Sequence, residues 1–185
     1  MTVPSLVVLL VLALGVCACA LVTWRFVRLR GTRAVTCPET KKTVAVEVNT
    51  ARAAITAAFG RPRFDLTECS RWPERRDCGR ECLSQIEDAP MNCLVRTKLA
   101  AWYEGRSCVA CGKPFGDIYW VTHRPASMAP DGTMLAWREV KAEQLAEVTE
   151  EHAPVCWDCY VHETFRRQHP ELVIDNPWKK AGPPA

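Results

Sequence analysis

Four cysteines in the C-terminal half form two pairs, each with two residues between its members. The pairs are Cys108-Val-Ala-Cys111 and Cys156-Trp-Asp-Cys159, and 44 residues separate them. Two intervening residues let both thiolates of a pair turn toward one ion, and two pairs supply the four sulfur ligands of a tetrahedral zinc site. Gly112 follows the first pair directly and suits the turn that would close it. The spacing predicts a closed zinc site with no position for a catalytic water.

A second, less regular group of cysteines lies upstream: Cys37, Cys69, Cys78, Cys82 and Cys93. Cys78 and Cys82 are four residues apart at the start of an expected helix, so they share one face. The favoured interpretation is a second zinc ion bound by Cys37, Cys69, Cys78 and Cys82, with Cys93 as the reserve ligand. One alternative is an iron–sulfur cluster held by four of the five, since a Cys-Pro step occurs in ferredoxin-type ligation. The other is reduced thiols packed in a small core.

The run from Val3 to Val22 carries no charge and is long enough to cross the hydrocarbon core of a bilayer as a helix. No charged side chain precedes it, which argues against a cleaved signal peptide. Positive side chains follow it instead: Arg25, Arg28, Arg30 and Arg33. Because positive residues beside a span stay on the cytoplasmic side, we expect a single-pass protein of the cell membrane. Its N-terminus would lie outside and its C-terminal domain in the cytoplasm.

This orientation determines the expected chemistry of the cysteines. The chain has 11 cysteines, and two of them, Cys17 and Cys19, lie inside the apolar run. In a reducing cytoplasm the other nine are expected to be metal ligands rather than disulfides. The reverse topology would instead favour four disulfides and one spare thiol.

Charge is concentrated directly behind the apolar run. The chain has a formal net charge of +3, and residues 25–42 contribute +5, so residues 43–185 carry −2. The basic segment suits anionic lipid head groups, at about 1 kcal/mol per residue near the surface, or it serves only to fix topology. No basic stripe remains on the globular part to follow a phosphate backbone. We therefore expect membrane lipids, and no nucleic acid, as partners.

Hydrophobic patterning behind the apolar run predicts an α+β fold. Strands are expected at residues 43–48, 64–66, 117–122 and 133–140, and helices at 51–59, 79–88, 94–104, 141–151 and 157–169. Asn49 is the expected cap of the helix over 51–59. The expected organisation is a transmembrane anchor (1–24), a basic juxtamembrane collar (25–42), a Cys-rich α+β domain (43–104), a CxxC/CxxC zinc-binding domain (105–172) and a flexible tail (173–185).

The order of a CxxC knuckle, a strand pair, a helix and a CxxC-bearing helix resembles the treble-clef group of zinc domains over residues 105–170. The resemblance rests on Cys108, Cys111, Gly112, Cys156 and Cys159. It implies one ion enclosed by the knuckle, a hairpin and the helix that carries the second pair. The long, partly helical insert between the pairs departs from the shortest members. Treble-clef domains bind proteins, nucleic acids or lipids, or are purely structural, so the resemblance implies a fold rather than an activity.

The sequence does not favour an enzyme. Zinc deaminases need a Glu two residues after the first ligand, but Ala110 stands there, and Pro154 is one position too early for their Pro-Cys-x-x-Cys element. A thioredoxin-like dithiol should follow a strand, whereas Cys108 follows an expected helix. We therefore expect a membrane-anchored zinc-binding scaffold or accessory protein that docks a protein partner at the membrane. The alternative is a membrane-tethered iron–sulfur redox protein.

Overall fold

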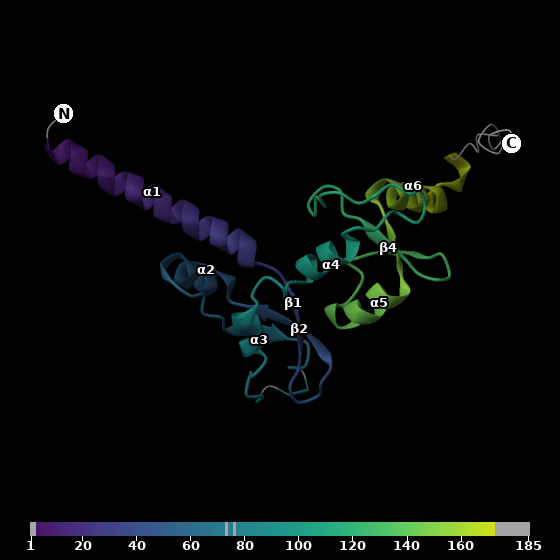
Figure 1. Cartoon of the computed structure of the whole chain (residues 1–185), viewed down its shortest axis with the longest axis horizontal. Helices are drawn as coiled ribbons and strands as arrows, with labels where there is room; N and C mark the ends of the chain where they lie inside the picture. The colour runs from purple at the N-terminus through teal and green to yellow at the C-terminus, as the bar shows by residue number, and fades with distance from the viewer. Residues whose placement is uncertain (1–2, 73, 76, 173–185) are drawn as a thin grey trace. The chain divides into compact units, whose positions relative to one another are not determined.

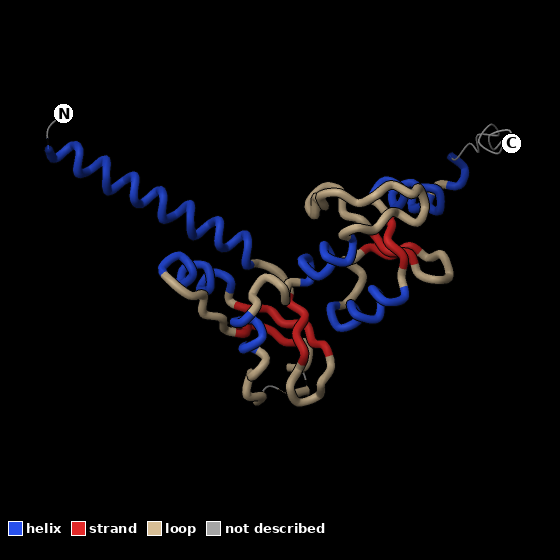
Figure 2. The backbone as a smooth tube through the Cα atoms, in the orientation of Figure 1, coloured by secondary structure: helices blue, strands red, loops and turns tan. Residues whose placement is uncertain are grey.

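The computed structural model of the chain describes residues 3–72, 74–75 and 77–172 (Figure 1). The expected tail, 173–185, lies outside the described residues. Two compact units divide the remainder. The first contains the chain up to Trp102 together with Val140–Glu147, and the second contains Tyr103–Glu139 and the chain from Val148. Each unit has its own three-stranded sheet, drawn in red in Figure 2, so the fold mixes helix and strand as predicted.

The apolar run forms one long helix, α1 (Val3–Leu29). Within its segment Val7–Leu29, the most apolar 18-residue window has a mean hydropathy of 2.7, and no side chain of that window is buried in the rest of the chain. The helix is therefore long and apolar enough to cross a membrane. It runs seven residues beyond the predicted Val22, because Trp24 to Leu29 continue the helix up to the first turn before the sheet.

The carbonyl end of α1 is closed by two arginines of the first unit. Arg33 donates to the carbonyls of Leu29 (2.5 Å) and Gly31 (3.1 Å). Arg96 donates to those of Val27 (3.3 Å) and Arg28. The last carbonyls of a helix have no partner within it and carry partial negative charge, so guanidinium groups both satisfy and stabilise them. Arg33 is 0% exposed, which differs from its expected place in a lipid-facing basic collar.

The sheet of the first unit is antiparallel in the order β1-β2-β3: β1 is Arg33–Thr36, β2 is Thr43–Val48 and β3 is Leu66–Cys69. The predicted strand at 43–48 is confirmed, and its alternating side chains Val44, Val46 and Val48 are buried in the core. Three helices follow in this unit: α2 (Thr50–Phe59), α3 (Leu83–Asp88) and α4 (Val95–Tyr103). A 3₁₀ turn, η1 (Ala142–Gln144), returns to pack on β2.

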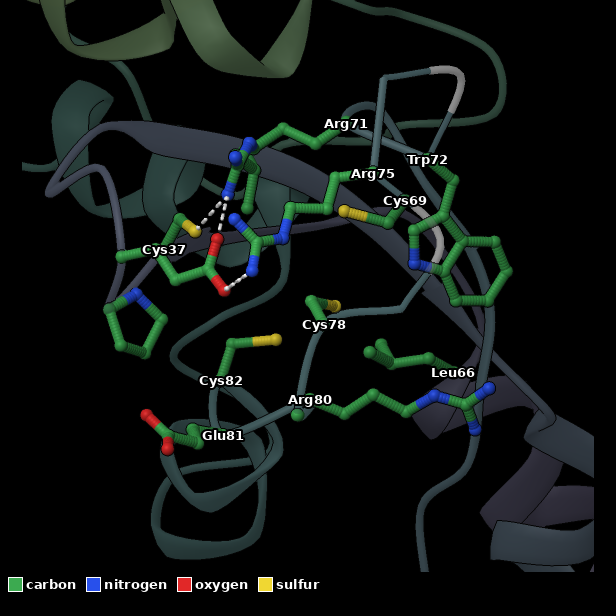
Figure 3. A pocket seen from close by; sticks show the side chains of 14 residues that line it. Cys37, Leu66, Cys69, Arg71, Trp72, Arg75, Cys78, Arg80, Glu81 and Cys82 are labelled. Atoms are coloured by element: carbon green, nitrogen blue, oxygen red, sulfur yellow. Dashed lines mark hydrogen bonds and ion pairs between the residues drawn. The ribbon is translucent and has the colours of Figure 1, made fainter.

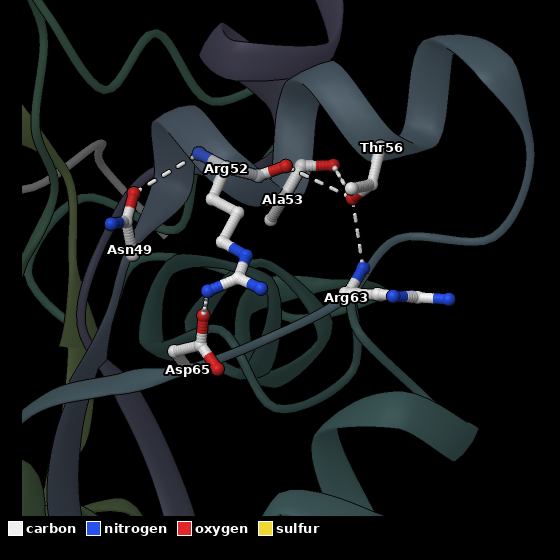
Figure 4. A network of polar contacts seen from close by, with 6 residues as sticks. All are labelled: Asn49, Arg52, Ala53, Thr56, Arg63 and Asp65. Carbon is white, nitrogen blue, oxygen red and sulfur yellow. Dashed lines mark hydrogen bonds and ion pairs between the residues drawn. The ribbon is translucent and has the colours of Figure 1, made fainter.

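Helix α2 is fixed at both ends by polar contacts (Figure 4). The predicted cap is confirmed, since the Asn49 side chain accepts from the Arg52 amide at 3.0 Å. Arg52 also pairs with Asp65 at 2.7 Å. At the other end, the Arg63 amide donates to the Thr56 hydroxyl at 2.9 Å. The loop after α2 is thereby held against the helix and leads directly into β3.

The second unit has a sheet in the order β5-β4-β6, with the central strand β4 at Ala126–Met128, β5 at Met134–Ala136 and β6 at Ala153–Val155. Helix α5 (Leu145–Glu151) precedes β6; α6 (Trp157–Gln168) and the 3₁₀ turn η2 (Pro170–Leu172) follow it. Tyr103 is fully buried, and its hydroxyl donates to the Ala126 carbonyl (2.6 Å) and accepts from the Trp137 indole (2.7 Å). This side chain anchors the start of the second unit to its central strand.

The strand predicted at 117–122 is wrong. The segment forms turns, in which the Tyr119 carbonyl accepts from the amides of Thr122 and His123. Tyr119 and Val121 face solvent, with Val121 83% exposed, while Ile118 and Trp120 are half-buried. The pattern matched a strand, but the segment has no partner strand among the described residues to satisfy its backbone.

Candidate metal centre

The two predicted cysteine pairs meet in the second unit. The sulfur atoms of Cys108, Cys111, Cys156 and Cys159 all lie within 4.8 Å of one another. The Cys111 and Cys156 sulfurs are 3.8 Å apart. A Zn–S bond of about 2.3 Å places the sulfurs of a tetrahedron about 4 Å apart. The four sulfurs are therefore spaced as ligands of one tetrahedral ion, and the cluster can hold a metal.

A tight turn presents the first pair. Ser107 and Pro114 form an isolated bridge across it, and the Cys108 amide donates to the Lys113 carbonyl at 2.8 Å. Inside this turn, the Gly112 amide donates back to the Cys108 carbonyl at 2.8 Å. Gly112 has φ +73°, in the left-handed region that other residues adopt only at a cost. The glycine after the pair is thus a requirement of the turn's backbone.

The second pair lies at the start of α6. Cys156 is the N-cap residue and Cys159 falls in the first turn. The Cys156 amide donates to the Cys108 sulfur at 3.3 Å. Another backbone bond, from Val109 to the Pro154 carbonyl of β6 at 2.9 Å, ties the turn to the strand that leads into the helix. The positive end of the helix dipole lies beside the sulfurs, where it favours thiolate charge.

The four thiols differ in acidity. Burial opposes ionisation of Cys108, but amide hydrogen bonds from Cys156, Cys111 and Ala110 outweigh it and lower its pKa to about 7. Burial and the neighbouring thiols raise the pKa of Cys156 and of Cys159. The metal-free cluster therefore stabilises one thiolate, and an ion that binds all four sulfurs must displace the remaining protons.

The donor set consists of sulfur only. No histidine or carboxylate belongs to the cluster. Cys108 is buried, Cys111 is exposed, and the other two are intermediate, so one side of the cluster faces solvent. Four sulfur ligands complete a tetrahedral ion without a vacant position, which is the pattern of structural rather than catalytic zinc sites.

The upstream cysteines are only partly brought together. Cys37, Cys69, Cys78 and Cys82 line one pocket of the first unit (Figure 3). Burial raises the pKa of Cys82, and the charges of Cys69, Cys78 and Cys37 raise it further, as expected of near neighbours. Among the described residues, however, these thiols are not placed as a second group that could hold a single metal ion.

Cys93, the expected reserve ligand, does not line this pocket. Its thiol contacts the Gln85 carbonyl at 3.4 Å, and its side chain packs against the core of the first unit. Burial raises its pKa. Cys93 is therefore placed as a packed thiol.

Sequence reasoning missed the basic side chains around this pocket. Arg71 donates to the Cys37 sulfur at 2.9 Å and pairs with Glu39 at 3.1 Å. The amide of Thr40 has the largest effect on Cys37 and, with further hydrogen bonds that include Arg71, lowers its pKa to about 7. The available signal was the repeated arginine in the loop between Cys69 and Cys82.

No family model matches the chain, and searches of curated proteins and of solved structures found no match. The functional argument therefore depends on the geometry of the chain itself.

Proposed function

We propose that the protein is a membrane-anchored zinc-binding scaffold that docks a protein partner at the cytoplasmic membrane face. The observation that carries the proposal is the set of four cysteine sulfurs in the second unit, which lie within 4.8 Å of one another. A closed all-sulfur site supplies folding free energy to a small unit and leaves no open position for catalysis.

Zinc fits this donor set best. Tetrahedral sulfur ligation suits zinc or iron. One pair of cysteines in a turn and a second pair at the start of a helix are typical of structural zinc sites. A turn and a helix (α6) carry the two pairs of sulfurs, and a short hairpin (β4 and β5) belongs to the same unit, which supports the treble-clef resemblance. The extra strand β6 directly before Cys156 extends that plan.

Exposed apolar side chains of the second unit support partner docking. They are Val109, Tyr119, Val121, Val161 and Phe165. The turn segment that contains Tyr119 and Val121 contacts α6, since the His123 and Trp157 rings lie 6.4 Å apart. Large apolar side chains that share a small surface around a rigid site are typical of a binding surface. The metal would fix the turn and the helix that present them.

The end of α1 supports the membrane contact. Arg25 and Arg28 lie over the Trp24 ring at 5.0 and 4.9 Å, a pairing suited to the head-group region. Helix α2 packs beside α1 and turns Ile55 and Phe59 outward, with Phe59 81% exposed. This outward face suits the bilayer surface. The arginines that follow the span favour the cytoplasmic side for both units.

Metal content and crosslinking together test the proposal. The full chain, purified in mild detergent, should carry zinc that is lost when Cys111 and Cys159 are both replaced by serine. A photo-crosslinking residue at Val121 should capture one specific protein in membranes, while the same residue at Glu150, exposed on α5, should not. Equal crosslinking at both positions, or capture that survives loss of zinc, would contradict a zinc-supported docking surface.

A further inference from the structure

The pocket of the first unit is built by four cysteines from separate segments. Cys37 follows β1, Cys69 ends β3, and Cys82 precedes α3; Cys78 lies in the loop between the last two. The pocket has a volume of about 80 Å³. Figure 3 shows the sulfurs of Cys69, Cys78 and Cys82 turned toward its interior, and the sulfur of Cys37 turned toward Arg71. Three thiols thus converge on one space, and Cys37, whose sulfur accepts from Arg71, also lines it.

The backbone of the ligand-bearing loops is strained. Two non-glycine residues among those described have positive φ, Lys41 at 59° and Arg80 at 55°. Lys41 lies in the turn between Cys37 and Lys42. The Cys37 amide closes this turn by donating to the Lys42 carbonyl at 2.8 Å. Arg80 lies between Cys78 and Cys82. Strain of this kind persists where the surroundings hold the backbone for a purpose, and here both cases shape loops that present thiols.

The surroundings are suited to an anionic sulfur centre. Arg71, Arg75 and Arg80 all line the pocket. Arg71 already donates to the Cys37 sulfur. The Glu39 carboxylate pairs with Arg71 at 3.1 Å and with Arg75 at 3.6 Å, and so holds both guanidinium groups in place. Hydrogen bonds to ligand sulfurs and nearby positive charge are the means by which proteins stabilise reduced clusters of iron and sulfide.

The spacing separates this pocket from the zinc-type cluster of the second unit. There, four sulfurs in the same metal-free chain already lie at the distances of a single tetrahedral ion. The upstream thiols line a cavity instead, and among the described residues they do not form a group placed to hold a single ion. A polynuclear cluster places several atoms between its cysteine ligands, so its ligands stand farther apart than those of one zinc ion.

We propose that Cys37, Cys69, Cys78 and Cys82 hold an iron–sulfur cluster in the first unit. This inference is independent of zinc binding by the second unit and of partner docking. It replaces the second zinc ion that the sequence favours with the alternative that the sequence left open. Cys93 takes no part in it.

Anaerobic purification of the full chain in detergent, followed by reconstitution with ferrous iron and sulfide, tests the proposal. We expect broad visible absorption, and iron and acid-labile sulfide in equal amounts, at about two or four of each per chain. Replacing Cys78 and Cys82 together by serine should abolish both. Cys93→Ser should leave the absorption and the iron content unchanged.

The zinc of the second unit serves as an internal control for folding. The Cys78/Cys82 double variant should retain its zinc at Cys108, Cys111, Cys156 and Cys159, which shows that loss of iron is not general unfolding. Two outcomes would overturn the proposal. One is a protein that holds no iron or sulfide after reconstitution. The other is a second zinc ion per chain that disappears in the same double variant.

Discussion

The two cysteine groups use the same side chain in different ways. In the second unit, each pair is local: two residues separate its members, and one turn or one helix start presents both sulfurs. In the first unit, single cysteines come from a turn, a strand end, a loop and a helix start. Local pairs fix half of the geometry before the fold forms, whereas dispersed ligands depend on the whole unit. The compact group therefore has zinc-like spacing, and the dispersed group surrounds a cavity.

The largest expected difference between the two groups follows removal of one ligand from the compact site. Cys108→Ser should release the zinc and unfold the second unit, because structural zinc contributes on the order of 10 kcal/mol to such units. The first unit should keep its structure. Limited proteolysis of the full chain in detergent should then cut within 103–139 and spare 33–69. Equal resistance of both units would contradict a metal-dependent second unit, and Cys93→Ser provides the matched control.

Thiol reactivity distinguishes the dispersed group next. In metal-free protein at pH 7, Cys37 should be alkylated roughly tenfold faster than Cys82 or Cys93, because only thiolates react. Its pKa is lowered to about 7, whereas burial raises the pKa of the other two. The rate at Cys37 should fall below pH 7 as its thiol becomes protonated, whereas the ratio of its rate to the other two should shrink as pH rises above 7, because Cys82 and Cys93 then begin to ionise. Mass spectrometry of iodoacetamide-treated protein measures these rates, and equal rates at all three thiols would rule out the activating contacts.

A smaller effect is expected for the core that supports the compact site. Tyr103→Phe removes the hydroxyl that joins Ala126 to Trp137. The loss of these two hydrogen bonds should destabilise the second unit by about 1–3 kcal/mol. Urea unfolding followed by tryptophan fluorescence measures the loss. An unchanged midpoint would mean that water replaces the hydroxyl. Tyr160→Phe, on the outer helix α6, is the comparison variant.

The smallest effect compares one glycine beside each group. Gly112→Ala forces a side chain into φ +73° and should cost about 1–2 kcal/mol. Zinc affinity should fall by roughly tenfold as a result. Gly79→Ala, next to Cys78, has no positive φ, and its added Cβ meets only the Glu81 side chain at 3.8 Å. It should change stability by a few tenths of a kcal/mol. Chelator competition measures the first effect, and thermal unfolding compares the two.

Local signals in the sequence predicted the elements that depend on few residues. The strand at 43–48 and the helix capped by Asn49 were correct because alternation and capping are properties of short segments. The two CxxC pairs come together in the structure for the same reason, since each pair is a local feature. The strands β1, β4 and β6 were missed. Each has only three or four residues, which is too short for a recognisable alternation, and each is defined by its pairing with another strand.

Long-range placement could not be predicted in the same way. Arg33 was expected to face lipid because arginine beside an apolar run usually does, but tertiary contacts bury it under the end of α1. Residues 117–122 have the alternating pattern of a strand, but they form turns because they have no partner strand among the described residues. Cys93 was close in sequence to the dispersed ligands, yet it packs against the core. In each case the deciding contact joins segments that no short pattern relates.

The arginine closure of α1 has a mechanical consequence. Because Arg33 and Arg96 grip the last carbonyls of the helix, and Leu29 is itself part of the core, no loose tether separates the helix from the first sheet. A displacement of the helix relative to the first sheet would strain these contacts and would reach β1 and the Cys37 turn that follows it. The position of α1 and the shape of the thiol pocket are therefore expected to change together.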